Sequence, residues 1–232
     1  MTKIHISSQT ETMALIVCET KDFLIADKPH GIPTVPLKSQ SPEGTLLGMV
    51  GKDYPEVLTI EGKNSWEGGT LHRLDTATSG LVVFARTREM YDYLQGVQQE
   101  DKLTKTYRAA TVENASLKGC ELNPKDKEEF EIVSYFRSYG KGSREVRPVQ
   151  DIKRADTPVP YKTTMTKEKD IFICTITRGF RHQIRAHLAW IGHPIEGDPL
   201  YGTGSGEDIL QLDCFRVCFP LPGGQLFSYA KY

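Results

Sequence analysis

One carboxylate, Asp75, lies where its surroundings favour a chemical role. It ends the run His72-Arg73-Leu74-Asp75, and the apolar residues 81–85 follow after a Ser-Gly break. That apolar run predicts a buried strand. A charge beside a buried strand must be paired or used, because desolvating it alone costs several kcal/mol. The pattern therefore indicates either a reactive carboxylate held in a loop or a structural aspartate that caps its own turn.

A second group with possible chemistry lies on a predicted strand, residues 104–112. The alternation of a strand puts Lys105 and Tyr107 on the same face. A tyrosine in a strand is usually a core residue or a cross-strand partner, and its ring can also stack on a flat ligand. Both interpretations of Tyr107 stay open on this pattern alone.

A third group lies on residues 180–192, which predict a helix with an apolar stripe at i, i+4 and i+7. Gly192 and Pro194 are the expected helix end. Arg181 and Arg185 are four residues apart, so they are expected to share another face. Two arginines on one face repel each other unless anions are near, and a carboxylate and a phosphate are the natural candidates.

The elements that would position these groups follow from local patterns. Strands are predicted over residues 14–18, 23–26 and 171–177, and a short helix over residues 45–50. Thr87 is the expected cap of a further helix, whose apolar face is formed by Met90, Tyr91, Leu94 and Val97. Residues 113–160 predict strands joined by long loops.

Three separated blocks within about residues 14–202 resemble the signature segments of the RluA-type pseudouridine synthases. The blocks are His72-Arg73-Leu74-Asp75 with Thr78-Ser79-Gly80-Leu81, Lys105-x-Tyr107, and Arg181-His182-Gln183-Ile184-Arg185-Ala186-His187-Leu188 with Gly192-His193-Pro194-Ile195-x-Gly197-Asp198-x-x-Tyr201-Gly202. The proline- and glycine-rich residues 27–33 resemble the segment that opens the same catalytic domain, where Lys28 and Pro29 would shape the floor of the site. The turn at residues 177–181 departs from the family pattern because it is longer. The expected contact of Arg181 with a phosphate depends on this turn.

The resemblance implies an α+β fold, in which a mixed, mostly antiparallel split β-sheet with flanking helices and loops carries the active-site cleft between its two halves. It also implies that Asp75 is catalytic, that Tyr107 lies against the target base, and that Arg185 pairs with Asp75. Other positions of these blocks are expected to bind RNA or uridine. They are His72, Arg73, Lys105, Arg181, His182, Gln183 and Ile184, the last of which would line the uracil pocket.

The implied reaction is the isomerisation of uridine in RNA to pseudouridine. The N1–C1′ bond breaks, the uracil turns, and C5 joins C1′, without a cofactor or a metal. Flipping the target base out of the stack costs a few kcal/mol, and Arg73 is placed to fill the gap or to hold a phosphate. Asp75 would act as a nucleophile at C1′ or as a base at C2′, and the sequence does not choose between these roles. Tyr107 is a poor base because its free pKa is near 10, so stacking on uracil is its expected role.

Charge gives a mixed indication about an RNA partner. The 232 residues carry a formal net charge of −1, whereas a phosphate-binding protein usually has a basic footprint. Basic residues are nevertheless concentrated within residues 137–154, where only Glu145 and Asp151 oppose them. They are Arg137, Lys141, Arg144, Arg147, Lys153 and Arg154. This segment is either an RNA contact, made through Arg144 and Arg147 among others, or a solvated loop.

Composition places the chain among soluble globular proteins, with 25% charged and 38% apolar residues. No apolar run approaches the roughly 18 residues of a membrane span, and the polar start lacks the core of a signal peptide. Scattered cysteines predict neither disulfides nor a metal site. We therefore expect a cytoplasmic monomer that binds RNA, either rRNA or tRNA, and no membrane. Its expected organisation is a flexible lead (residues 1–13) and a single catalytic domain (residues 14–232) with no S4-like domain.

Two other functions are compatible with parts of the sequence. A non-catalytic RNA-binding module on the same fold would not need Asp75, Tyr107 and Arg185 together. A hydrolase that uses Asp75 with His72 or His182 would release free uracil or another cleaved product, and neither a nucleophile elbow nor a metal pattern supports it.

Overall fold

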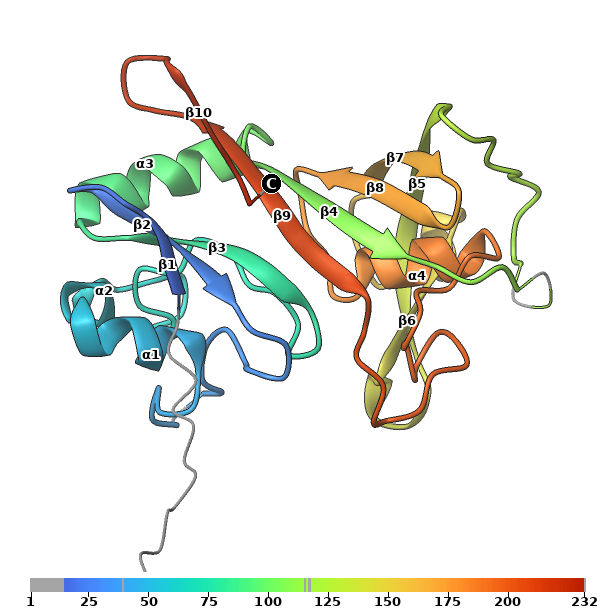
Figure 1. The fold of residues 1–232 in the computed structure, drawn as a ribbon, viewed down its shortest axis with the longest axis horizontal. Helices are drawn as coiled ribbons and strands as arrows, with labels where there is room; N and C mark the ends of the chain where they lie inside the picture. The colour runs from blue at the N-terminus through green and yellow to red at the C-terminus, as the bar shows by residue number, and fades with distance from the viewer. Residues whose placement is uncertain (1–14, 39, 115, 117, 232) are drawn as a thin grey trace, which may run out of the picture.

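The computed structural model describes residues 15–38, 40–114, 116 and 118–231 (Figure 1), so the expected lead of residues 1–13 lies outside the described residues. In chain order the strands are β1 (Leu15–Glu19), β2 (Phe23–Lys28), β3 (Ser79–Ala85), β4 (Thr104–Ala110), β5 (Glu129–Tyr139), β6 (Glu145–Val149), β7 (Tyr161–Glu168), β8 (Ile171–Ile176), β9 (Leu212–Pro220) and β10 (Leu226–Ala230). The helices are α1 (Leu46–Asp53), α2 (Glu56–Thr59), α3 (Arg88–Gln99) and α4 (Gln183–Trp190), with short 3₁₀ helices η2 (Lys141–Ser143) and η3 (Ile152–Arg154).

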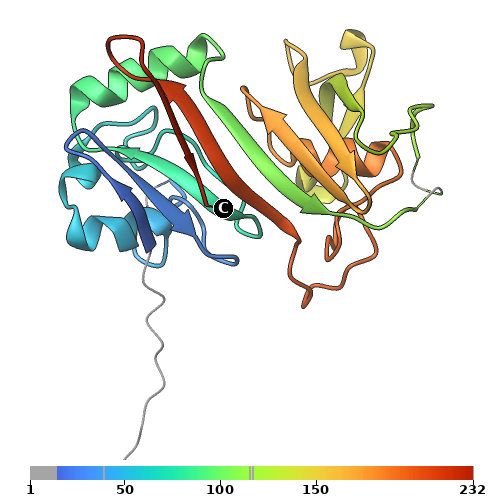
Figure 2. The same cartoon turned by 45° about the horizontal axis from the view of Figure 1, so that its top comes forward.

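These strands form a sheet in the order β1-β2-β3-β9-β4-β8-β7-β5-β6, with β10 paired to β9. Most neighbours are antiparallel, whereas β3 and β9 run parallel. The long pair β4–β9 runs through the middle of the molecule. Helices α1, α2 and α3 lie with β1, β2 and β3 on one side of it, and α4 lies with β5–β8 on the other (Figures 1 and 2). The predicted α+β fold with a mixed, mostly antiparallel sheet is confirmed.

The parallel contact between β3 and β9 requires Gly80. This residue has a positive φ of 119°, and a Cβ atom on it would lie 2.4 Å from backbone atoms of Cys214. Only glycine fits so close an approach without strain. The Ser-Gly break of the sequence therefore marks the point where the loop carrying Asp75 enters the sheet.

Helix α3 forms where its apolar spacing predicts it. The hydroxyl of Thr87 accepts a hydrogen bond from the backbone N–H of Met90, as expected of an N-cap. Met90, Tyr91, Leu94 and Val97 are buried in the large core cluster. The face that the sequence marks as apolar is the face that fixes this helix.

A smaller core lies on the other side of β4–β9 and contains a fully buried histidine. The ring of His187, on α4, stacks on Phe136 with 5.1 Å between centroids. Its Nδ1 lies 2.8 Å from the hydroxyl of Thr163 and its Nε2 lies 2.9 Å from that of Ser134. Burial lowers the pKa of His187 to about 3, so the neutral ring is part of the fold.

His187 is expected to make the protein acid-sensitive. Its unfolded pKa is about 6.5, so the unfolded chain binds the extra proton as pH falls from about 6.5 towards 3, and stability is lost in that window. Between pH 7 and pH 5 this group alone accounts for about 2 kcal/mol. Urea unfolding of wild type and His187→Gln at both pH values measures it. The wild type should lose about 2 kcal/mol more than the variant, and equal losses would contradict the assignment.

Candidate functional site

The loop that carries Asp75 is held by hydrogen bonds of its backbone rather than by the Asp75 carboxylate. The carbonyl of Asp75 accepts from the N–H of Thr78, and the hydroxyl of Thr34 bonds both the carbonyl and the N–H of Leu74. The Asp75 side chain is 34% exposed. Among the described residues no backbone N–H donates to its carboxylate, so the interpretation of Asp75 as the cap of its own turn is wrong.

Lys28 lies beneath this loop and is fully buried. Its ammonium donates to the carbonyls of Pro29, Ile32 and Thr76, at 2.9, 2.7 and 3.2 Å. Burial lowers its pKa to about 8, although the charge of Asp75 opposes the shift. Lys28 thus ties the loop of residues 28–32 to the residue after Asp75, which fits the expected role in shaping the floor of the site.

Asp75 meets the third sequence block at His182. The Nε2 atom of His182 lies 3.9 Å from the Oδ2 atom of Asp75. Asp75 comes from the loop before β3, whereas His182 directly precedes α4 on the other side of β4–β9. The two halves of the sheet therefore bring separate signature blocks together at this point.

The predicted direct ion pair between Arg185 and Asp75 is not formed in this structure, because Arg185 pairs with Asp198. Burial lowers the pKa of Arg185, but Asp198 and also the charge of Asp75 act against that shift and hold it above its usual value. Its Nε and a terminal N–H donate to the two Asp198 oxygens at 2.7 and 2.8 Å, and both side chains are buried. Burial alone would raise the pKa of Asp198, but the guanidinium and the backbone N–H groups of Leu200 and Tyr201 hold it below its usual value. Asp198 lies in a turn that is closed by its own N–H bonding the Ile195 carbonyl and by the Gly202 N–H bonding the Asp198 carbonyl.

The predicted helical face shared by Arg181 and Arg185 is also wrong. Helix α4 begins at Gln183, and His182 before it is left-handed with φ of 56°. Arg181 therefore leaves the helix, is exposed, and donates to the carbonyls of Ser143 and Glu145 at 2.5 and 3.4 Å. It links the segment before α4 to the hairpin of β5 and β6.

Tyr107 lies at a bulge where β4 and β9 shift register. Bulges often re-aim side chains beside active sites. Tyr107 is buried, and burial, together with neighbouring Cys214 and the charge of Asp75, raises its pKa well above 10. The hydroxyl stays protonated at neutral pH, which argues against a base role, and the stacking role stays a prediction.

Several residues expected to bind RNA are buried and bonded inside the protein. Nε2 of His72 accepts from the N–H of Val83, and the ammonium of Lys105 donates to a backbone carbonyl. Gln183 bonds the backbone of Phe180 and Lys162. These placements do not favour direct contact with RNA. Ile184 is buried as well, and its place in a uracil pocket stays a prediction.

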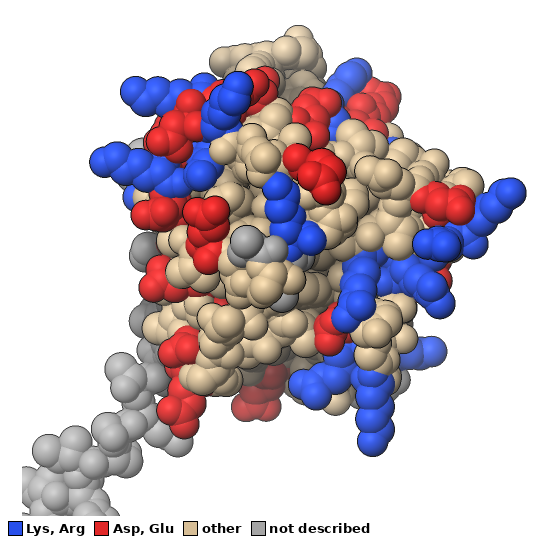
Figure 3. Space-filling model, turned by 90° about the vertical axis from the view of Figure 1, so that its right-hand side faces the viewer, with Lys and Arg blue, Asp and Glu red and all other residues tan. Residues whose placement is uncertain are grey.

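Three other expected RNA contacts lie at the surface. Arg73, two residues before Asp75, is 62% exposed and pairs with Glu67. Arg144 is exposed at the tip of the β5–β6 hairpin, and Arg147 stacks 3.3 Å over the ring of Tyr139. The basic segment is therefore an ordered hairpin at the end of the sheet. Figure 3 shows this side of the molecule, where blue side chains gather towards the lower right of the face.

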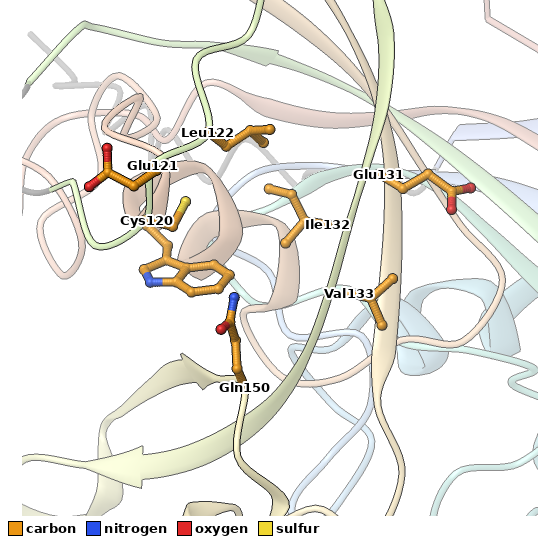
Figure 4. Close-up of a pocket in the computed structure, with 8 residues that line it drawn as sticks. Cys120, Glu121, Leu122, Glu131, Ile132, Val133 and Gln150 are labelled. Atoms are coloured by element: carbon orange, nitrogen blue, oxygen red, sulfur yellow. The ribbon is translucent and has the colours of Figure 1, made fainter.

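A pocket of about 410 Å³ lies elsewhere, at the C-terminal end of α4. It is lined by Cys120, Glu121, Leu122, Glu131, Ile132, Val133, Gln150 and Trp190 (Figure 4). The eight residues of α4 separate it by roughly 12 Å of helix from the end where His182 meets Asp75. We place the candidate site at the Asp75–His182 junction, because that is where the reactive groups converge.

Two residues of this junction, Asp198 and Tyr201, had no role in the sequence interpretation. Both belong to the third block, so their spacing after Gly197 was the available signal. In the described part of the chain, His, Cys, Asp and Glu side chains do not gather in threes as metal ligands would. Along the same residues, no helix combines the length and apolar character needed to cross a membrane.

Comparison with known sequences identifies related proteins. The family model described as RNA pseudouridylate synthase matches residues 22–190. A Yersinia pestis protein named ribosomal large subunit pseudouridine synthase D is 29% identical over 81% of this chain and 52% of its own length. A Helicobacter pylori protein named as an uncharacterized RNA pseudouridine synthase is 32% identical over 90% of this chain and 65% of its own length. The chain thus spans about half to two thirds of these relatives.

Solved structures support the fold. Human RNA Pseudouridylate Synthase Domain Containing 1 matches with a TM-score of 0.66 and 19% identity, over 94% of this chain and 83% of that one. Human RNA Pseudouridylate Synthase Domain Containing 4 matches with a TM-score of 0.60 and 17% identity, over 94% of this chain. At these identities the likeness concerns architecture.

Proposed function

The chain belongs to the RNA pseudouridylate synthase family, and on that premise we propose that it isomerises uridine in RNA to pseudouridine with Asp75 as the catalytic residue. The observation that carries this proposal is the state of Asp75. Its carboxylate is part-exposed, is not bonded to the backbone of its own turn, and faces His182 across the junction of the two halves. A carboxylate left unbonded in a rigid loop is available to a substrate.

The surrounding residues fit the steps of this reaction. Arg73 is exposed beside Asp75, where it can fill the gap left by a flipped base or hold a phosphate. Tyr107 offers a ring for the uracil to stack on. Asp75 attacks C1′ or removes the proton at C2′, and both routes use the ionised carboxylate. The proposed enzyme needs no cofactor and no metal, and it acts as a cytoplasmic monomer on rRNA or tRNA.

The test is product analysis on unmodified transcripts of rRNA and tRNA. Large-subunit rRNA comes first, because the Yersinia pestis relative is named for it. We expect pseudouridine after digestion to nucleosides, with no free uracil. Free uracil would indicate a hydrolase, and RNA binding without product would indicate a binding module. Mapping pseudouridine in total RNA with and without the gene identifies the target uridine.

The hairpin of β5 and β6 is proposed to bind RNA phosphates through Arg144 and Arg147. Affinity for single-stranded RNA falls with salt at a log–log slope of roughly −0.7 per phosphate contact, so Arg144→Ala with Arg147→Ala should flatten that slope by about 1.4. The rate on RNA already bound should not change. Lys21→Ala with Lys52→Ala, two exposed lysines on the β1–β2 turn and α1, is the control. An unchanged slope in the arginine variant would mean that the hairpin is a solvated surface.

A further inference from the structure

His182 has an unusual backbone for a residue with a side chain. Its φ is 56°, in the left-handed region that histidine rarely adopts. Such a conformation is strained and persists where surrounding contacts hold it, often at functional sites. Here it directs the half-buried ring towards Asp75, with Nε2 3.9 Å from the carboxylate. The contacts on the other ring nitrogen explain what holds it there.

Tyr201 fixes the hydrogen positions of this ring. Its hydroxyl oxygen accepts from the N–H of Val146 at 2.8 Å and lies 3.0 Å from Nδ1 of His182. Burial raises the pKa of Tyr201 to about 12, so the hydroxyl keeps its proton. When the Tyr201 hydroxyl donates its proton to Nδ1, the Val146 N–H, the hydroxyl and Nδ1 all have hydrogen-bond partners. The hydrogen of the neutral imidazole ring then lies on Nε2. The opposite tautomer would point the lone pair of Nε2 at the Asp75 carboxylate.

Burial is the main reason that His182 is neutral at neutral pH. Burial lowers its pKa, Asp75 and Asp198 oppose that shift, and Arg185 and Arg181 add to it. The ring is therefore an N–H donor rather than a cation. The Nε2–H group, 3.9 Å from the Asp75 carboxylate, forms a hydrogen bond to it after a movement of about 1 Å. Catalytic hydrogen bonds commonly tighten only when substrate is bound.

We propose that His182 is a positioning residue that orients the Asp75 carboxylate through Nε2–H, with its tautomer fixed by Tyr201 and, through Val146, by the β5–β6 hairpin. This inference rests on the proposed role of Asp75. It replaces the expected contact of His182 with RNA. It also gives Tyr201 a function, which is to link the hairpin backbone to the catalytic carboxylate.

Two replacements of His182 that differ in side-chain length test the proposal. His182→Gln extends an amide N–H towards the position of Nε2, whereas His182→Asn tolerates the left-handed backbone but stops short of Asp75. Because a misplacement of about 1 Å can cost a hundredfold in rate, His182→Asn should lower the single-turnover rate between tenfold and a hundredfold. Its Kd for RNA should stay within twofold. His182→Gln should recover most of the lost rate.

Tyr201→Phe tests the link to the tautomer. It should slow the reaction in the presence of His182, but Tyr201→Phe combined with His182→Asn should be no slower than His182→Asn alone. Tyr229→Phe, on β10, is the matched control.

A full rate in His182→Asn, or a loss confined to RNA affinity, would overturn the proposal. Asp75→Asn is assayed in parallel. If it makes pseudouridine, the role proposed for Asp75 has failed, and if it is inactive while His182→Asn is fast, only the role of His182 has failed.

Discussion

Asp75→Asn is expected to abolish pseudouridine formation and to leave the fold and the RNA affinity intact. The carboxylate makes no hydrogen bond to the described residues that the amide would lose, and it is 34% exposed. The stability change should therefore stay below about 1 kcal/mol. The amide can neither attack C1′ nor take a proton from C2′, so the rate should fall at least a hundredfold. Nucleoside analysis after single-turnover reaction measures this.

The control for this change is Asp53→Asn. Asp53 is an exposed aspartate at the end of α1, so the same loss of charge there should leave the rate unchanged. Urea unfolding and RNA titration of both variants separate chemistry from folding and binding. A rate for Asp75→Asn within tenfold of wild type would remove Asp75 from the chemistry, whatever the family resemblance implies.

Local patterns predicted the elements well where the apolar signal is uninterrupted. Helix α3 has its apolar residues at the helical spacing that the core requires, and β3 is an apolar run after Gly80 that is buried on both faces. The helix follows from its periodicity, and the strand follows from its continuous apolar run. Within residues 113–160, β5 does alternate, with Ile132, Ser134 and Phe136 buried on one face. The strand β6 has no such pattern, because it lies at the end of the sheet and only Val146 in it is buried.

The contacts among the candidate site residues were harder to predict than the elements. The structure brings Asp75 and His182 to 3.9 Å, but the helical pattern of residues 180–192 does not indicate that Arg185 pairs with Asp198 in the turn beyond it. A helical pattern through residues 180–182 suggested a common face for Arg181 and Arg185, and the left-handed His182 breaks it. The buried lysines were equally hard to foresee, since lysine is almost never fully buried. Lys28 is buried because three carbonyls surround its ammonium.

The bidentate pair of Arg185 and Asp198 should carry a large stability effect, because both side chains are buried. Breaking a buried ion pair by removing one partner costs about 3–5 kcal/mol, because the other charge stays buried without compensation. Arg185→Gln would leave the Asp198 carboxylate in that state. Asp198→Asn would keep the acceptor for the N–H groups of Leu200 and Tyr201 but would turn an amide donor towards the guanidinium.

The double variant Arg185→Gln with Asp198→Asn tests whether Arg185 acts through its pair with Asp198 or, as the family resemblance implies, through Asp75. Both positions are then neutral, and the Gln oxygen can accept from the Asn amide. We expect the double variant to cost at least 2 kcal/mol less than the sum of the two single variants in urea unfolding. If Arg185 acts by holding the turn of residues 195–201, activity should recover along with stability. Additive losses would mean that the two side chains do not act as a pair. Recovered stability without recovered activity would mean that the charge of Arg185 serves Asp75 directly, as the resemblance implied.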